Sequence, residues 1–266
     1  RRRLASNLPV PAIPLVGREA ELAALARLLD DRQCRLLTIA GPGGVGKTRL
    51  AVEAAAVHAG RFAHGAHFVP LAPLSAPAMV IPAIADVLGC AFSGPADPQQ
   101  QLVSCLRGKS LLLLLDNLEH LLEASVDLAD LLQRAPGVKL LVTSRERLNL
   151  HGEWLFDLQG LPVPSAGQVD GVEDYSSVAL FLQSARRVQA GFARPEPGAE
   201  DRRAIVRICR LVDGLPLAIE LAAAWVRLLS CAEIAGEIEC NIDFLTGATR
   251  DMPRRHQSLR AVFYHS

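Results

Sequence analysis

Short apolar runs alternate with longer amphipathic stretches through roughly the first 160 residues of the chain. The run at 109–117 has no polar alternation, as expected for a strand covered on both faces, and other compact apolar runs predict further strands. The predicted strands are 34–41, 65–72, 109–117, 138–145 and 153–160. Helices are predicted at 17–31, after the glycine-rich segment to about residue 60, and at 76–89, 97–107 and 119–134. This alternation predicts an α/β fold with a doubly wound parallel sheet of five strands.

The pattern changes beyond about Tyr175, where successive stretches have helical periodicity and no apolar strand separates them. We therefore expect an all-helical second domain, with a boundary near Ser165 in the loop LPVPSAGQ. The expected divisions are a proline-rich linker at 1–14, an α/β domain at 15–164 and a helical domain at 165–252. The chain starts at Arg1 rather than Met and stops inside a helical pattern, so we expect it to be part of a larger protein.

Net charge and the spacing of the cysteines limit which partners, metals and cellular locations fit this chain. The 28 basic and 28 acidic side chains give zero formal net charge, which argues against broad binding of nucleic acid or membrane surfaces by this segment. The six cysteines form no CxxC pair and have no histidine at the spacing of a zinc site. We therefore expect reduced cysteines and a cytoplasmic location. Since no apolar run reaches the length of a membrane span, no membrane association is expected.

The segment GPGGVGKT, Gly41 to Thr48, carries the clearest chemical signal, and we call it the phosphate loop. It follows a predicted strand, precedes a predicted helix and matches the pattern GxxxxGK[ST]. Its backbone N–H groups can converge on phosphate oxygens, and the helix N-terminus adds positive potential. Lys47 would bridge the β- and γ-phosphates and the Thr48 hydroxyl would ligate Mg²⁺. The expected nucleotide-binding set is Gly41, Pro42, Gly43, Gly44, Val45, Gly46, Lys47, Thr48 and Arg49.

Lysine usage strengthens this interpretation. Only three lysines (Lys47, Lys109 and Lys139) accompany 25 arginines in the chain. A compact ammonium fits among crowded phosphate oxygens where a planar guanidinium would not. A glycine-rich turn without a ligand is therefore a poor explanation of the segment.

Two later strand ends supply further candidates for catalysis. In the segment LLLLLDN the apolar run ends at Asp116, which would hold Mg²⁺ through water together with Thr48. The next residue is Asn117, and because an amide cannot take a proton, hydrolysis should be slow. Glu119 could act as the base instead, although it fits equally well as a residue that starts the next helix. Arg145 follows the run LLVTS and would sense the γ-phosphate if the two strands are neighbours in the sheet.

Taken together, these segments resemble the nucleotide-binding core of the STAND ATPases, the signal-transduction ATPases with numerous domains. The resemblance runs through PLVGREAEL, GPGGVGKTRLA, LLLLLDNLEHLL, LLVTSRERL, DGLPLAIELAA and RHQSLRAVFYHS, and covers nearly the whole chain. It is strongest to the core of large bacterial LuxR-type, SARP-type and cyclase-linked regulators. The resemblance implies ATP or ADP with Mg²⁺ as ligand, ADP as the resting species, and a change from a closed to an open form that drives self-association or releases an effector domain.

The resemblance also implies roles for residues outside the phosphate loop. Val16, Gly17 and Arg18 would flank the adenine, and Arg145 would be the first sensor. Pro216, in the motif of Gly214, Leu215 and Pro216, would pack on the adenine from the helical domain. Residues 253–266 would begin a winged-helix region.

Three functions remain compatible with the sequence. The first is a regulatory switch in which slow turnover resets the nucleotide state, and this is the interpretation we favour. The second is a mechanical or replicative AAA-type enzyme, which would need an acid beside Asp116 and an arginine finger supplied by another subunit. The third is a scaffold that holds nucleotide and never hydrolyses it.

Overall fold

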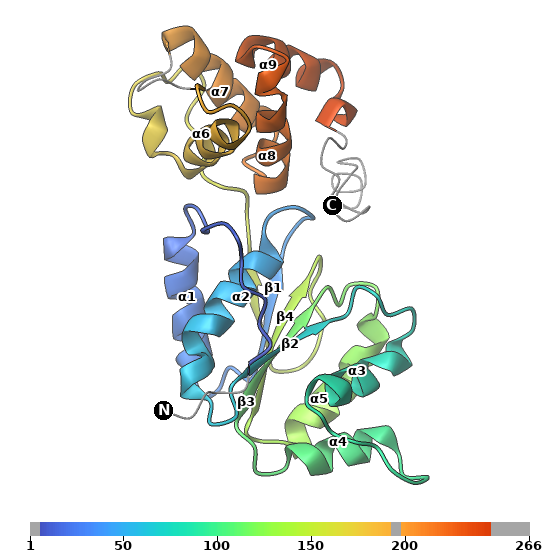
Figure 1. Ribbon diagram of the computed structural model, residues 1–266. Helices are drawn as coiled ribbons and strands as arrows, with labels where there is room; N and C mark the ends of the chain where they lie inside the picture. Colours follow the sequence, from blue (N-terminus) through green and yellow to red (C-terminus); the bar gives the residue numbers. More distant parts are fainter. Residues whose placement is uncertain (1–5, 193–197, 246–266) are drawn as a thin grey trace. The chain divides into compact units, whose positions relative to one another are not determined.

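The computed structural model describes residues 6–192 and 198–245 (Figure 1). The chain divides into two compact units, one of residues 1–41 with 47–157 and the other of residues 42–46 with 158–266. The main division therefore falls between Asp157 and Leu158, ahead of the loop at Ser165 where the sequence pattern places it. Backbone contacts explain the difference, because the Leu161 N–H donates to the Gly214 carbonyl at 2.8 Å and Ser177 Oγ donates to the Pro162 carbonyl at 2.7 Å. The expected winged-helix segment at 253–266 lies outside the described residues.

The first unit is built on a five-stranded, fully parallel sheet, as the sequence predicts. The strand order is β2-β3-β4-β1-β5. Its strands are β1 (Leu36–Ala40), β2 (Ala66–Pro70), β3 (Leu111–Asp116), β4 (Val138–Ser144) and β5 (Glu153–Asp157). Every residue of β1, β3 and β4 is buried, which accounts for their apolar composition without alternation.

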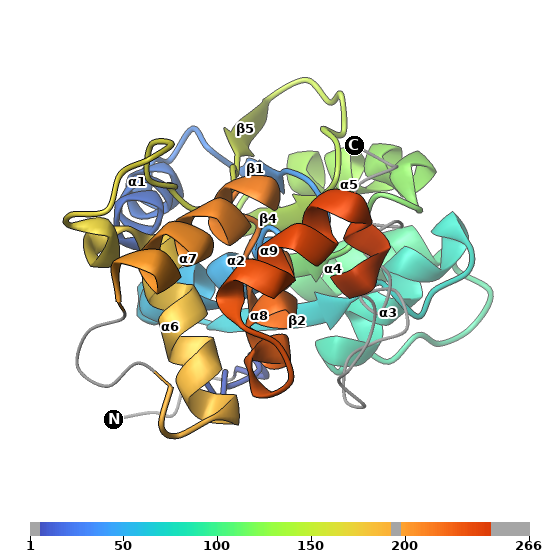
Figure 2. The same ribbon diagram turned by 90° about the horizontal axis from the view of Figure 1, so that it is seen from above.

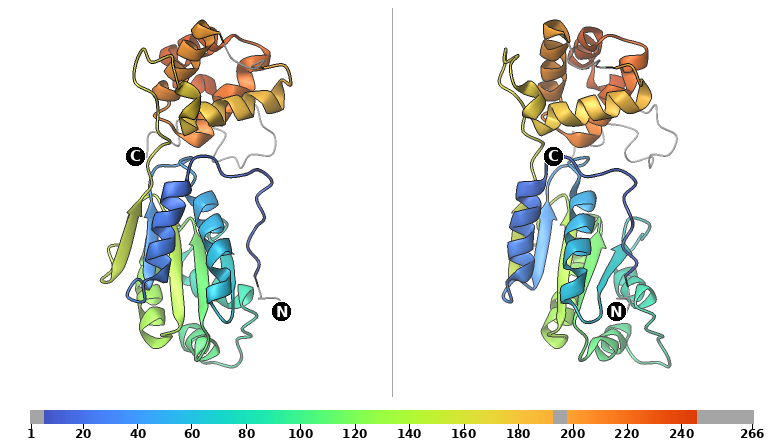
Figure 3. Two further views of the ribbon diagram at one scale, coloured as in Figure 1. Left: turned by 90° about the vertical axis from the view of Figure 1, so that its left-hand side faces the viewer. Right: turned by 60° about the vertical axis from the view of Figure 1, so that its left-hand side comes forward.

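Helices cover both faces of this sheet (Figures 1 and 3). One face carries α1 (Glu19–Asp30) and α2 (Lys47–His58), and the other carries α3 (Val80–Val87), α4 (Pro98–Leu106) and α5 (Ser125–Arg134). Short 3₁₀ turns lie at η1 (Ala59–Arg61), η2 (Pro77–Met79) and η3 (Leu122–Ala124). An apolar cluster joins α3, α4 and α5 to inward-facing leucines of β3, including Leu111, Leu113 and Leu115.

The helix predicted at 119–134 starts later than the sequence suggests. Residues 117–121 form an irregular segment and a turn, η3 follows, and α5 begins only at Ser125. The Leu118 N–H donates to the Thr143 carbonyl at 3.0 Å, which ties this segment to the end of β4. Tertiary hydrogen bonding thus overrides the helical periodicity here, and it keeps residues 117–120 at the edge of the sheet.

The expectation that all cysteines are reduced is wrong for two of them. Cys90 and Cys105 form a disulfide with their Cα atoms 6.2 Å apart. The bond joins the segment that follows α3 to helix α4, two elements that pack against each other within the same apolar cluster. Cys34, Cys209, Cys231 and Cys240 are free. Sequence spacing alone does not reveal the pair, because tertiary packing brings the two sulfur atoms together.

The second unit is helical in its described part, as predicted (Figure 2). Its helices are α6 (Ser176–Val188), α7 (Ala199–Leu211), α8 (Pro216–Ala224) and α9 (Cys231–Cys240), with 3₁₀ turns η4 (Val172–Asp174), η5 (Trp225–Arg227) and η6 (Ile242–Leu245). Helix α6 packs on α8 and α7 packs on α9. Ser230 and Glu233 form a reciprocal capping box that starts α9.

Gly214 occupies a position that excludes a side chain. Its φ is +64°, and a Cβ there would lie 2.1 Å from the Leu161 carbonyl oxygen. Gly214 ends the corner after α7, and Pro216 takes the first turn of α8, where its missing N–H leaves no partner unsatisfied. The corner is therefore fixed by backbone geometry.

None of the helices within residues 6–192 and 198–245 is long and apolar enough to cross a membrane.

Candidate functional site

The carboxyl edge of the sheet gathers the candidate catalytic residues. β4 lies between β1 and β3, with Ala40 paired to Ser144 and Leu115 paired to Val142. The phosphate loop leaves β1, Asp116 ends β3 and Arg145 follows β4, so all three emerge at the same edge. The strand preceding Arg145 neighbours the strand ending in Asp116, which is the condition on which the predicted sensor role of Arg145 depends.

The backbone of the phosphate loop adopts the turns that its glycines permit. Gly44 and Gly46 have φ of +74° and +98°, in the region that favours glycine, and Val45 between them is fully buried. Helix α2 starts at Lys47, directly after the loop. Loop residues 42–46 group with the second unit, in which the Leu217 N–H donates to the Gly44 carbonyl at 3.2 Å. The loop therefore presents backbone donors and a helix N-terminus to an anion.

The Lys47 side chain is hydrogen-bonded to the phosphate loop, and its burial destabilises the charged ammonium. Its ammonium donates to the Gly41 carbonyl at 2.7 Å. Burial lowers the pKa of Lys47 to about 8, nearby Glu119 and Asp116 raise it, and Arg145 lowers it. Phosphate oxygens would supply the negative charge that this buried ammonium requires, so the geometry fits the role predicted for Lys47.

This lowered pKa leads to a measurable proton linkage. Because the pKa of Lys47 is about 8, about half of the unliganded protein should have a neutral Lys47 amine at pH 8. Bound phosphates favour the ammonium, so ADP binding at pH 8 should take up roughly half a proton, and ADP affinity should fall as pH rises above this value. Titration calorimetry with ADP and a chelator, in two buffers of different ionisation enthalpy, measures the uptake. At pH 7 only about a tenth of the unliganded protein should have a neutral Lys47 amine, so the uptake should fall to roughly a tenth of a proton; equal uptake at the two pH values would contradict the assignment.

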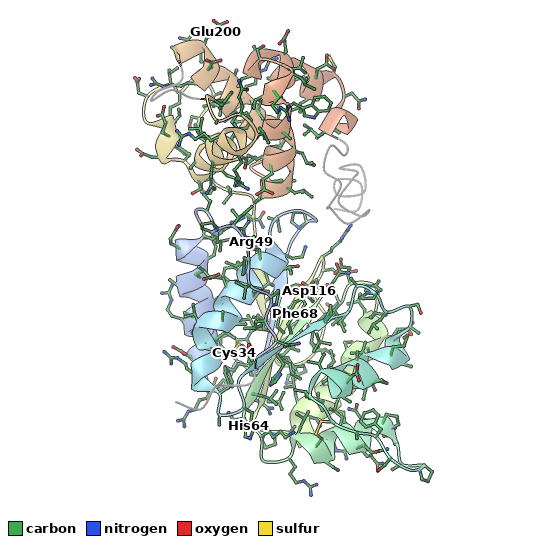
Figure 4. The ribbon with its side chains drawn as sticks, viewed as in Figure 1. Cys34, Arg49, His64, Phe68, Asp116 and Glu200 are labelled. Atoms are coloured by element: carbon green, nitrogen blue, oxygen red, sulfur yellow. A yellow bond between two sulfur atoms is a disulfide. The ribbon has the colours of Figure 1, made fainter. Side chains whose placement is uncertain are left out.

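Asp116 is the buried anion of the site (Figure 4). Its Oδ1 accepts hydrogen bonds from Thr48 Oγ1 at 2.6 Å and from Thr143 Oγ1 at 2.7 Å. A carboxylate and a hydroxyl are the hard oxygen ligands that Mg²⁺ prefers, and they lie within hydrogen-bonding distance of each other. The residues present therefore fit a magnesium ion that shares its remaining ligands with phosphates and water.

Thr143 is a functional residue that the sequence analysis does not single out. Besides donating to Asp116, its hydroxyl oxygen accepts from the Asn117 N–H at 2.9 Å. The sequence offers one sign of such a role, because Thr143 is a polar residue near the carboxyl end of an otherwise apolar strand. Its importance depends on β4 lying beside β3, which the sequence does not reveal.

Glu119 and Arg145 form an ion pair, with Arg145 Nε 3.3 Å from Glu119 Oε1. The second carboxylate oxygen of Glu119, Oε2, is buried and accepts no hydrogen bond from the described residues. The structure thus brings together the candidate base and the candidate sensor, which the sequence treats separately. Each holds the other at the edge of the sheet, close enough to Lys47 to influence its pKa.

The residues expected to flank the adenine lie just before α1. Gly17 has φ of +64°, Val16 is half-buried, and Arg18 is buried and pairs with Glu21 at 2.5 Å. The Arg49 guanidinium donates to the backbone carbonyls of Ile13 and Pro14. Arg49, which we expected to contact nucleotide, thus anchors the segment that leads into Val16. Whether these residues and Pro216 contact adenine stays a prediction.

Comparison with known proteins shows which family the first part of the chain is similar to. Residues 14–143 match the family described as AAA ATPase domain. This match covers 130 of the 266 residues of the chain. A Mycobacterium tuberculosis protein named "Putative HTH-type transcriptional regulator" is 39% identical over 234 residues, which cover 86% of this chain and 24% of that protein. The regulatory protein AfsR of Streptomyces griseus is 30% identical over 253 residues, 87% of this chain and 23% of AfsR.

Solved structures have a similar fold over most of this chain. A STAND protein with a tetratricopeptide repeat sensor from Pyrococcus horikoshii is similar with a TM-score of 0.50 and 19% identity, over 80% of this chain and 30% of that one. Cdc6p from Pyrobaculum aerophilum has a TM-score of 0.54 and 19% identity, over 83% and 64% of the two chains. The chain spans about a quarter of the length of the regulators reported above. The expected resemblance to a P-loop core of large bacterial regulators is confirmed.

Proposed function

We propose that this chain is the nucleotide switch of a larger bacterial regulator, which binds ATP or ADP and hydrolyses ATP slowly. The observation that carries the proposal is the pair Asp116 and Asn117 at the end of β3. Asp116 accepts a hydrogen bond from Thr48, the other residue expected to bind magnesium. The next residue, Asn117, has an amide side chain and follows the end of the strand. A site that holds Mg²⁺ and phosphates but lacks an adjacent base favours long-lived nucleotide states over rapid turnover.

The residues have distinct roles in this proposal. The phosphate loop and Lys47 bind the β- and γ-phosphates, and Thr48 and Asp116 hold Mg²⁺, which would neutralise charge on the phosphate oxygens. Arg145 senses the γ-phosphate, restrained by Glu119. Hydrolysis would remove the group that Arg145 and Lys47 contact, so the ATP-bound and ADP-bound sites would differ in charge. A difference in contacts between two nucleotide states is the requirement for a switch.

One feature of the structure supports a link from nucleotide to the helical unit, and the relatives support a regulatory role. The corner formed by Gly214, Leu215 and Pro216 groups in one compact unit with loop residues 42–46. The relatives reported above include proteins named as regulators, which supports a regulatory parent protein. Self-association in the ATP state and a cytoplasmic location belong to the same proposal.

The test is to denature the purified protein, identify any nucleotide released, and then measure single-turnover ATP hydrolysis. We expect ADP at about one per chain and a turnover rate at least about 100-fold below the roughly 10 s⁻¹ of a median enzyme. A rate per chain that rises steeply with protein concentration would instead favour a mechanical AAA-type enzyme. Complete absence of hydrolysis would favour a scaffold that only holds nucleotide.

A further inference from the structure

His120 lies beside Asn117 at the edge of the sheet, where the chain turns before η3. We propose that His120 is a positioning residue, which orients the Asn117 amide so that its carbonyl oxygen accepts a hydrogen bond from the water that attacks the γ-phosphate. The inference rests on the proposed ATP hydrolysis, and it assigns that reaction a residue pair besides the magnesium ligands and the sensor.

The contacts of the imidazole fix its tautomer. His120 Nε2 lies 3.0 Å from the Leu74 carbonyl oxygen, which can only accept a hydrogen bond. Nε2 must therefore carry the proton, and in the neutral ring Nδ1 has a free lone pair. Nδ1 can then act only as an acceptor toward its other neighbour.

That neighbour is the Asn117 amide, whose Nδ2 lies 3.4 Å from His120 Nδ1. An accepting Nδ1 selects the NH₂ group of the amide and would repel its carbonyl oxygen. The amide is thus oriented with Nδ2 toward His120 and Oδ1 on the opposite side. An amide oxygen has two acceptor sites, so Oδ1 can accept a hydrogen bond from a water beside one other contact.

The backbone of Asn117 is fixed as firmly as its side chain. Its φ is +70°, a conformation that asparagine tolerates better than most residues. Its N–H donates to Thr143 Oγ1, and that hydroxyl donates to Asp116 Oδ1. Asn117 is therefore held to the magnesium ligand through Thr143 and to the β2–η2 loop through His120, which leaves the amide little freedom to turn.

This arrangement assigns Asn117 an orienting role in hydrolysis. The water oxygen forms a bond to the γ-phosphorus, and the bond from that phosphorus to the β–γ bridging oxygen breaks, so ADP leaves with the electron pair. Asn117 accepts a hydrogen bond from the water but takes no proton, and the proton leaves with the phosphate product. Correct orientation of the attacking water accelerates this step without a strong base.

A double-mutant cycle tests the proposal. Asn117→Gly removes the amide and tolerates the positive φ, while His120→Ala removes the imidazole. We expect His120→Ala to lower the single-turnover rate about tenfold, with ADP affinity changed less than about twofold. In the Asn117→Gly background, His120→Ala should have no further effect, because its only route to the reaction is the amide. His120→Asn, which keeps an acceptor near the position of Nδ1, should recover most of the rate.

His64→Ala is the matched control. His64 is also exposed, and its Nδ1 accepts a backbone hydrogen bond, from the Ser110 N–H at 3.1 Å. Figure 4 labels His64 and Asp116 at opposite ends of the sheet, so this variant should leave the rate unchanged. A rate loss from His120→Ala that is equal with and without Asn117, or is matched by lost ADP affinity, would overturn the inference and leave the proposed switch standing. A wild-type protein that binds ADP but never hydrolyses ATP would instead overturn both.

Discussion

Lys47→Ala should abolish nucleotide binding, with ADP affinity lowered at least about 100-fold. The wild-type ammonium lies at the phosphate loop, where burial already disfavours its charge, as the lowered pKa of about 8 indicates. Phosphates are the partner that makes this charge favourable, so the ammonium contributes more to binding than an exposed lysine would. Isothermal titration calorimetry with ADP and Mg²⁺ measures the loss.

One control variant and one control measurement show whether the loss is specific to the nucleotide site. Lys109→Ala is the same substitution at a residue whose ammonium contacts the sulfur of Cys105, and it should leave affinity unchanged. Thermal unfolding of nucleotide-free Lys47→Ala should occur no lower than in the wild type, because the substitution removes a partly desolvated charge. Unchanged ADP affinity in Lys47→Ala would show that this loop is not the nucleotide site.

The fold could be predicted from the sequence where local patterning and tertiary structure agree. The leucine-rich run before Asp116 forms a strand buried on both faces, as its lack of alternation requires. Gly214 and Pro216 end one helix and start the next for backbone reasons that are local. By contrast, the late start of α5 depends on the hydrogen bond from Leu118 to Thr143, residues that belong to different strand–helix units.

The same distinction applies to the site. The phosphate loop and Asp116 are contiguous signals, and the structure places them at one edge of the sheet. Thr143 and His120 gain their roles only from neighbours that are distant in sequence, Asp116 and the Leu74 carbonyl. The disulfide of Cys90 and Cys105 escaped prediction for the same reason. Local sequence patterns therefore miss the residues whose contacts depend on strand order and tertiary packing.

Asp116→Asn should change function and stability in opposite directions. Turnover of ATP with Mg²⁺ should fall at least about 100-fold, because a neutral amide is a poor ligand for Mg²⁺ and lacks the charge that balances it. The nucleotide-free protein should become more stable by about 1 kcal/mol, or roughly 2–4 °C in Tm. The amide oxygen still accepts from Thr48 and Thr143, and the cost of burying a carboxylate disappears.

Loss of the attraction between Asp116 and Lys47 opposes this gain in stability. It should not reverse it, because Glu119 raises the pKa of Lys47 more than Asp116 does and remains in place. Asp157→Asn, at the exposed carboxyl end of edge strand β5, is the matched control and should alter neither quantity appreciably. Single-turnover hydrolysis and calorimetric unfolding of the wild type and the two variants measure the change in turnover and the change in stability. If Asp116→Asn lost stability and kept turnover, the carboxylate would be a structural anchor of Thr48 and Thr143. Loss of turnover together with a gain in stability is the result expected if the Asp116 carboxylate serves to bind Mg²⁺ and not to stabilise the fold.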